Sequence, residues 1–184
     1  MSVAADRHRR FAGAFTHRVD GVTDWSVPTP VSDWTARDVV DHLIAWSSAF
    51  LAAGGVDLPA GPAVADDPAV AWNHHAAQVQ ALLDAGDADR VFVHPYAGEH
   101  PLDVAIDRFY TTDVFLHTWD LARATGQPAT LDLEQCAEIL EGMRPIDKLL
   151  RSSGQYGPAV PVAADASVQD QLLGFIGRDP AWRP

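Results

Sequence analysis

The stretch TTDVFLHTWDLARATGQ, residues 111–127, has a helical apolar rhythm that two polar side chains interrupt. Asp113 and His117 are four residues apart, which places them on one face of a helix, about one turn from each other. Phe109 and Leu116 belong to the same face, so the pattern predicts that the carboxylate and the imidazole point inward. A buried carboxylate must be paired, protonated or bound to a metal. A metal ion would satisfy both groups, and it would need one more ligand from elsewhere in the chain.

The segment WTARDVVDHLIAW, residues 34–46, supplies a third polar group in an inward position. His42 falls on the stripe of apolar residues that this helix should turn toward the core (Val39, Leu43, Trp46 and Phe50). Two imidazoles and one carboxylate form a catalytic type of zinc site with a fourth position open. The same set also binds Fe(II) or Ni(II). Without a metal, Asp113 and His117 would hydrogen-bond to each other, and His42 would be an ordinary core histidine.

Helices account for the rest of the pattern, which predicts an all-α bundle. Thr35 and Asp38 have the spacing of a capping box at the start of the second helix. Pro145 should kink or end the fifth helix, and only a short extended piece is expected near residues 91–93. The expected helices cover about residues 4–19, 35–54, 68–83, 101–124 and 132–145, with a short last helix at 167–177.

Composition limits the class of protein. The 184 residues include 47% hydrophobic ones, which predicts a single folded domain over residues 1–184. The net charge is -12 with only 13 Lys and Arg, which argues against nucleic-acid partners and anionic membranes. We expect neither a membrane span nor a signal peptide, and therefore a cytoplasmic protein. The single cysteine, Cys136, lies in a helical pattern and is expected to fill core space.

Three stretches carry a resemblance to a known family: VPTPVSDWTARDVVDHLIAW, DVFLHTWDLARATGQ and SGQYGPAVPVAADASVQDQLLGFIGRDPAW. They resemble the actinobacterial branch of the DinB-like metal-binding bundles, which is related to the metal-binding domain of mycothiol-dependent maleylpyruvate isomerase. The resemblance covers nearly the whole chain. It implies an up-and-down four-helix bundle with an additional C-terminal helical segment, and a metal held by His42, Asp113 and His117.

Two departures from the family pattern affect the reaction. The isomerase looks to use Glu where this chain has the shorter Asp113, so the helix must approach the metal more closely or bind it through water. The isomerase also carries a further C-terminal domain thought to help hold substrate, and this sequence has none after Pro184. The particular isomerase reaction is therefore not implied for this chain.

Several neighbours of the predicted ligands could take part in the site. Trp46, Trp119 and Arg123 are candidate substrate-binding residues, although their pattern favours core packing for the two indoles. Asp38 and Asp120 are candidate carboxylates for orienting the imidazoles. Four further histidines are expected at the surface because they lack a common helical spacing with the predicted ligands: His74, His75, His94 and His100.

The sequence supports two functional hypotheses. In the first, a divalent metal, zinc before nickel or iron, binds a low-molecular-weight thiol and makes thiolate available for a transferase or isomerase reaction on a small electrophile. The enzyme would then be a mycothiol-dependent S-transferase or isomerase. In the second, the protein is a non-catalytic metal-dependent ligand-binding or sensor module. Both take a small molecule as partner, and both are compatible with a homodimer.

Overall fold

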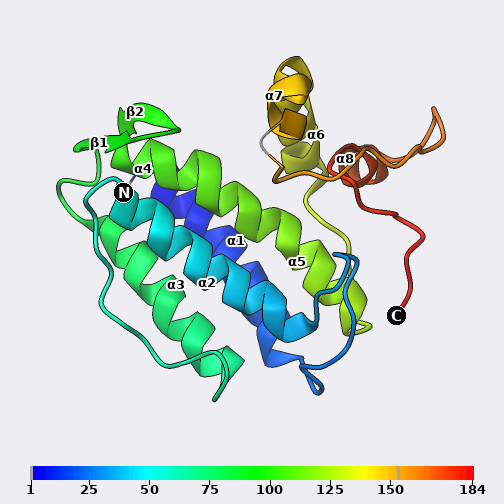
Figure 1. Cartoon of the computed structure of the whole chain (residues 1–184), viewed down its shortest axis with the longest axis horizontal. Helices are drawn as coiled ribbons and strands as arrows, with labels where there is room; N and C mark the ends of the chain where they lie inside the picture. Colours follow the sequence, from blue (N-terminus) through cyan, green and yellow to red (C-terminus); the bar gives the residue numbers. More distant parts are fainter. Residues whose placement is uncertain (1, 153) are drawn as a thin grey trace.

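The computed structural model describes residues 2–152 and 154–184, and most of them are helical. Figure 1 shows long helices packed side by side, with a smaller group of short helices at one end of the chain. Three long helices come first: α1 (Val3–Asp20), α2 (Ala36–Ala53) and α3 (Pro68–Asp84). A continuous helical rod then follows: α4 (Leu102–Ala105), η1 (Ile106–Thr111) and α5 (Thr112–Ala124).

Side chains in the first turns satisfy backbone N–H groups that a helix start leaves free. Ser2 Oγ accepts from Ala5 N–H in α1, and Asp67 Oδ1 accepts from two N–H groups in α3. The predicted capping box at Thr35 and Asp38 is confirmed at the start of α2. Local sequence signals therefore set where these helices begin.

The order of the helices around the bundle differs from a simple up-and-down arrangement. Helix α1 contacts α3 and α5, and α2 contacts the same two helices, so α1 and α2 occupy opposite corners. The connection over residues 21–35 is long enough to cross between these corners, whereas an up-and-down bundle joins adjacent helices by short loops. This arrangement makes α2 a neighbour of α5, which brings the two predicted ligand-bearing helices together.

The rod over residues 102–124 contains a π-helical segment, η1, that the sequence pattern did not predict. A π-helical turn holds more residues than an α-helical turn, so the inward face shifts within it. Tyr110 is fully buried, whereas Phe109, which a regular α-helix would turn inward, is only partly buried. The α-helical register resumes before Asp113.

A small antiparallel hairpin precedes the rod, formed by β1 (Val91–His94) and β2 (Gly98–Pro101). Its Phe92 is buried against Phe50 of α2, so the extended piece expected near residues 91–93 is present and has a paired partner strand. Within the described residues, the fold therefore departs from the predicted all-α class by this small two-stranded sheet.

The C-terminal lobe consists of α6 (Leu133–Met143), the 3-10 turn η2 (Arg144–Ile146), α7 (Asp147–Ser152) and α8 (Val168–Phe175). Pro145 lies in the 3-10 turn directly after α6, which confirms that it ends the regular helix. A second hydrophobic cluster joins the lobe to the bundle, because Phe115 and Trp119 of α5 pack with Leu140 and Leu172 of the lobe. This attachment determines where the C-terminal residues meet α5.

Replacing Gly174 with alanine should destabilise the lobe. A Cβ atom there would lie 2.6 Å from the carbonyl oxygen of Val160, and the Val160 N–H donates to the Gly174 carbonyl, so the two backbones cannot separate freely. We expect a loss of about 1–3 kcal/mol in the free energy of unfolding, measured by urea denaturation.

Gly13 in α1 is the matched control for this substitution, since a Cβ there meets no atom within 4 Å. Gly13→Ala should leave stability unchanged or raise it by up to about 1 kcal/mol, because alanine favours helix over glycine. Equal losses in both variants would contradict the close contact at Gly174.

Candidate metal centre

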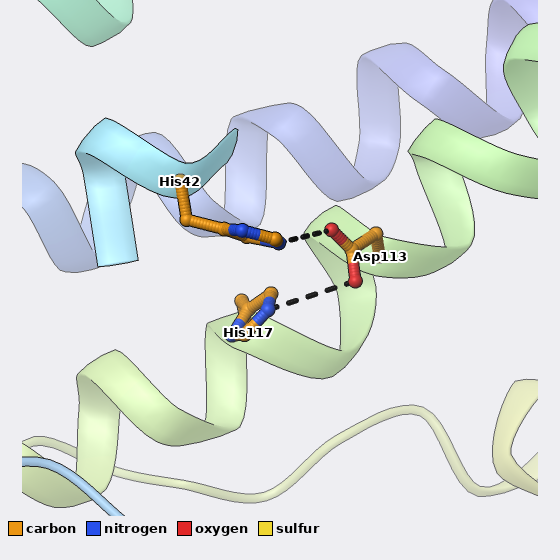
Figure 2. Close-up of side chains that lie close together, drawn as sticks. All are labelled: His42, Asp113 and His117. Carbon is orange, nitrogen blue, oxygen red and sulfur yellow. Dashed lines mark hydrogen bonds and ion pairs between the residues drawn. The ribbon is translucent and has the colours of Figure 1, made fainter. Parts of the chain in front are cut away.

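The three predicted ligands converge between α2 and α5. His42 Nε2 lies 3.0 Å from one carboxylate oxygen of Asp113, and His117 Nε2 lies 3.6 Å from the other (Figure 2). The two imidazole rings are 4.9 Å apart between centroids, and their planes are inclined at 64°. The i, i+4 spacing on α5 and the adjacency of α2 together produce this cluster.

The donor set fits a divalent metal ion. One ligand atom from each residue lies within 4.8 Å of the other two. Donor atoms that share a tetrahedral zinc ion lie about 3.3 Å apart, so the observed separations of 3.0 and 3.6 Å need only small side-chain movements. Two nitrogens and one oxygen leave at least one coordination position for another molecule. His42, Asp113 and His117 could therefore hold a metal ion, and zinc, iron and nickel all accept this set.

Although Asp is shorter than Glu, Asp113 places one carboxylate oxygen near Nε2 of each histidine. The metal-free alternative expected a hydrogen bond between Asp113 and His117, with His42 as a core histidine. Asp113 instead lies within hydrogen-bonding distance of His42 Nε2, at 3.0 Å, while His117 Nε2 is 3.6 Å away. The His117 ring is buried, whereas His42 and Asp113 keep side-chain exposures of 28% and 21%. Access to the cluster is thus from the side of His42 and Asp113.

Two tryptophans flank the histidines. Trp46, a predicted substrate-binding candidate, lies one turn beyond His42 with 6.4 Å between ring centroids, and it lines the adjoining pocket. Trp34 stacks on His117 at 5.7 Å and contacts His42 at 4.9 Å. Trp34 was not predicted as a site residue, although it stands in the same segment as His42. The loop before α2 thus contributes an aromatic wall beside the metal ligands.

A pocket of about 730 Å³ adjoins the three ligands and extends between the bundle and the C-terminal lobe. Its volume lies within the range of small-molecule sites in proteins. Apolar side chains from both sides form much of its wall, including Leu116 of α5 and Ile139 of α6. At the polar part of the wall, Arg7 lies 3.3 Å from Glu138 and 3.5 Å from Asp107. The lobe therefore adds a second wall to the helix face that carries the ligands and makes it one side of a partly open pocket.

Asp120, which the sequence predicted as a candidate orienting carboxylate, lies next to the ring nitrogen of His117 that does not face Asp113. His117 Nδ1 lies 2.8 Å from Asp120 Oδ2. Arg178, which follows α8, donates from Nε and Nη2 to the two Asp120 oxygens at 2.9 and 3.0 Å. Arg178 had not been predicted, because 58 residues separate it from Asp120 and no local spacing relates them.

Burial and neighbouring charges shift the pKa values of His117 and Asp120 in opposite directions. Burial lowers the pKa of His117, but Asp113 and Asp120 outweigh it and leave the pKa raised. For Asp120, burial raises the pKa, while Arg178 and His117 outweigh that effect and hold it below its usual value. Asp120 is therefore an ionised carboxylate in a fully buried position, kept there by its partners.

Three other candidates are not brought to the ligands. Asp38 accepts hydrogen bonds from the backbone N–H and hydroxyl of Thr35, so it caps α2 and does not orient His42. Trp119 is buried in the second hydrophobic cluster and does not line the pocket. Arg123 donates to the Pro180 carbonyl and lies over the Trp119 ring, outside the pocket wall. Trp119 and Arg123 lie on other faces of α5 than the ligands, whereas Asp38 shares the face of His42 but is held at the helix start by Thr35.

The surface placement expected for His75 is wrong. His75 is buried and lies 2.7 Å from Ser47 Oγ, while its neighbour His74 is exposed. His8 of α1 is also buried, 3.0 Å from Thr111 Oγ1, and the rings of both histidines flank Tyr110. Desolvation lowers the pKa of each imidazole to about 4. His8 belongs to the inward stripe of α1 with Phe11 and Phe15, a signal that was present in the sequence.

Two other histidines that were expected at the surface, His94 of β1 and His100 of β2, are half-buried in the hairpin and do not join the ligands. Cys136 is fully buried, and burial raises its pKa to about 11. That environment keeps the thiol protonated at neutral pH and agrees with the expected packing role. The chemistry available to the pocket thus comes from the three ligands and the side chains lining it.

The fold and the cluster together define a helical protein with a candidate metal site at a pocket. The chain is similar to uncharacterized protein Rv0738 and uncharacterized protein MT0763, from two strains of Mycobacterium tuberculosis. Each is 36% identical over 157 residues, which are 82% of this chain and 83% of the relative. The chain belongs to the family of these two proteins. No family model matches the chain. No solved structure matches it either.

No helix within residues 2–152 and 154–184 combines the length and the apolar character needed to cross a membrane.

Proposed function

We propose that this protein binds a divalent metal ion through His42, Asp113 and His117 and uses it with a low-molecular-weight thiol in a transferase or isomerase reaction. The observation that carries the proposal is the position of the three ligand atoms, within 4.8 Å of one another, at the wall of the pocket. A divalent ion bound there would lower the pKa of a coordinated thiol. The resemblance to the mycothiol-dependent isomerase points to the same chemistry, with zinc as the first metal to test.

The residues of the chain would contribute binding and orientation. His42 and His117 serve as neutral nitrogen ligands, and Asp113 supplies a negative charge that offsets part of the metal charge. Trp34 and Trp46 restrict the approach to the ligands, and the apolar wall of the pocket favours the carbon skeleton of a small substrate. In a transfer reaction the thiol proton would pass to water, the sulfur would bond to an electrophilic carbon, and the leaving group would depart with the electron pair.

A non-catalytic ligand-binding or sensor function is the second candidate. It is favoured by the way ionisable side chains at the pocket already pair with each other: Arg178 with Asp120, and Arg7 with Glu138 and Asp107. Groups held in such pairs are less available to transfer protons to a substrate. A sensor would use the same metal site to recognise its ligand.

The experiment uses tag-free protein, purified and analysed for bound metal, with mycothiol and cysteine as thiol probes. We expect either thiol to raise the melting temperature of the zinc-loaded protein but not of the chelator-treated protein, since only the native metal form offers the site. Cobalt-substituted protein should then develop a thiolate-to-cobalt absorption band.

Conjugation of monobromobimane with the thiol separates the two candidates. Metal-dependent conjugation above the rate in buffer supports the enzyme, whereas thiol binding without conjugation of this or other electrophiles supports the sensor. Protein that binds no divalent ion would contradict both functions.

A further inference from the structure

The buried carboxylate of Asp120 links the candidate metal centre to the end of the chain. Only 1% of its side chain is exposed, and its contacts come from two directions. Oδ2 lies near His117 Nδ1, while Arg178 holds both oxygens through two nitrogens. A paired arrangement of this kind fixes the plane of the carboxylate as well as its position.

We propose that Arg178 is a positioning residue of the metal centre, acting on His117 through Asp120. The proposal rests on the proposed metal-binding function and adds a residue from outside the bundle to it. Because Asp120 is fixed by Arg178, the negative charge on its Oδ2 stays 2.8 Å from His117 Nδ1, and this charge favours the imidazole tautomer that carries its proton on Nδ1.

That tautomer is the one a metal ligand at Nε2 requires. With the proton on Nδ1, the lone pair of Nε2 is free, and Nε2 is the nitrogen that faces Asp113 at 3.6 Å. The opposite tautomer would present an N–H to the cluster and could not coordinate there. Arg178 therefore controls which nitrogen is available, without contacting the metal.

The placement of Arg178 also couples the site to the fold of the C-terminal lobe. Arg178 is the third residue after the end of α8, whose Leu172 and Leu173 are fully buried in the cluster shared with α5. The guanidinium reaches Asp120 only when α8 is packed on the bundle. When the lobe packs on the bundle, it therefore completes the pocket wall and also places Arg178 against Asp120, which contacts the ligand His117.

Arg151 offers a matched control in the same lobe. It donates to the carbonyls of Phe175 and Gly157, so it also fixes the end of α8, but it neither contacts Asp120 nor lines the pocket. Replacement of either arginine by methionine keeps an unbranched apolar side chain and removes the guanidinium. A loss that reflects only a weakened lobe should appear in both variants.

The test measures Zn²⁺ and Co²⁺ affinities of full-length wild type, Arg178→Met, Arg178→Lys and Arg151→Met by competition with a chelator. Loss of an outer partner of a ligating histidine typically lowers affinity about 10- to 100-fold. We expect that loss in Arg178→Met, a smaller loss in Arg178→Lys, and an affinity within about threefold of wild type in Arg151→Met. The last result is expected even if both methionine variants melt at lower temperature. Wild-type affinity in Arg178→Met, or equal losses in the two methionine variants, would overturn the proposal.

A second measurement separates this inference from the proposed function. Nitrogen-15 NMR of the chelator-treated proteins reports the His117 tautomer directly, with metal absent. The wild type should carry the proton on Nδ1, and Arg178→Met should show a mixture. A protein that binds no metal but shows this shift would refute the proposed function and retain the positioning role. Identical tautomers in both proteins would refute the positioning role alone.

Discussion

His117→Ala is expected to lower the affinity for zinc by more than the roughly 10- to 100-fold that loss of an outer partner costs, because it removes a ligand itself. The remaining pair, His42 and Asp113, would offer only two donors, fewer than the three protein ligands usual for a catalytic zinc site. Metal content after dialysis and the chelator-competition affinity both measure this loss.

His17→Ala is the matched control, since His17 is exposed in the last turn of α1 and lies outside the cluster. It should retain the metal content of the wild type. His42→Ala and Asp113→Ala should each behave as His117→Ala does, and wild-type metal content in all three would show that the metal binds elsewhere or not at all.

Acid should destabilise the protein through two buried histidines that are not among the candidate metal ligands. His8 and His75 are buried and have pKa values of about 4, compared with 6.5 for a free imidazole. As the pH falls below 6.5, the unfolded chain takes up protons at these positions, while the folded protein does not until about pH 4. The free energy of unfolding should therefore fall across this interval, by about 3 kcal/mol for each histidine.

Neighbouring charges modify this effect without reversing it. Burial is the largest cause of the lowered pKa in both rings; Arg9 and His75 lower the pKa of His8 further, and Asp84 raises it. For His75, the nearby His74 adds to the effect of burial. The prediction is thus dominated by the cost of charging a ring inside the bundle.

The measurement is urea unfolding of the metal-free protein at several pH values between 4 and 7. In the variant His8→Asn/His75→Gln, each new amide can place a polar atom where the native ring nitrogen made its contact with Thr111 or Ser47. Neither amide side chain titrates. This variant should lose most of the pH dependence in that interval, whereas His17→Gln should keep it. A wild-type stability that stays constant from pH 6.5 to 4 would show that these rings are not buried as neutral groups.

Much of the bundle was predictable because its signals are local. Capping residues, proline positions and apolar spacing indicated the helices, and the capping box at Thr35 was found where expected. The spacing of Asp113 and His117, with His42 on an inward stripe, also predicted the candidate ligands. The prediction for His75 failed because adjacent residues on a helix differ by about 100° in direction, so His74 and His75 cannot share an environment.

The sequence by itself determined most of the helical segments and most of their inward faces, since these depend on residues within a few helical turns of each other. It also marked His42, Asp113 and His117 as polar side chains in inward positions. Only the tertiary structure decided that α2 lies next to α5, that the C-terminal lobe closes a pocket over the ligands, and that Arg178 pairs with Asp120. Those contacts join positions far apart in the chain. They depend on how whole helices pack, and no local spacing of residues encodes that.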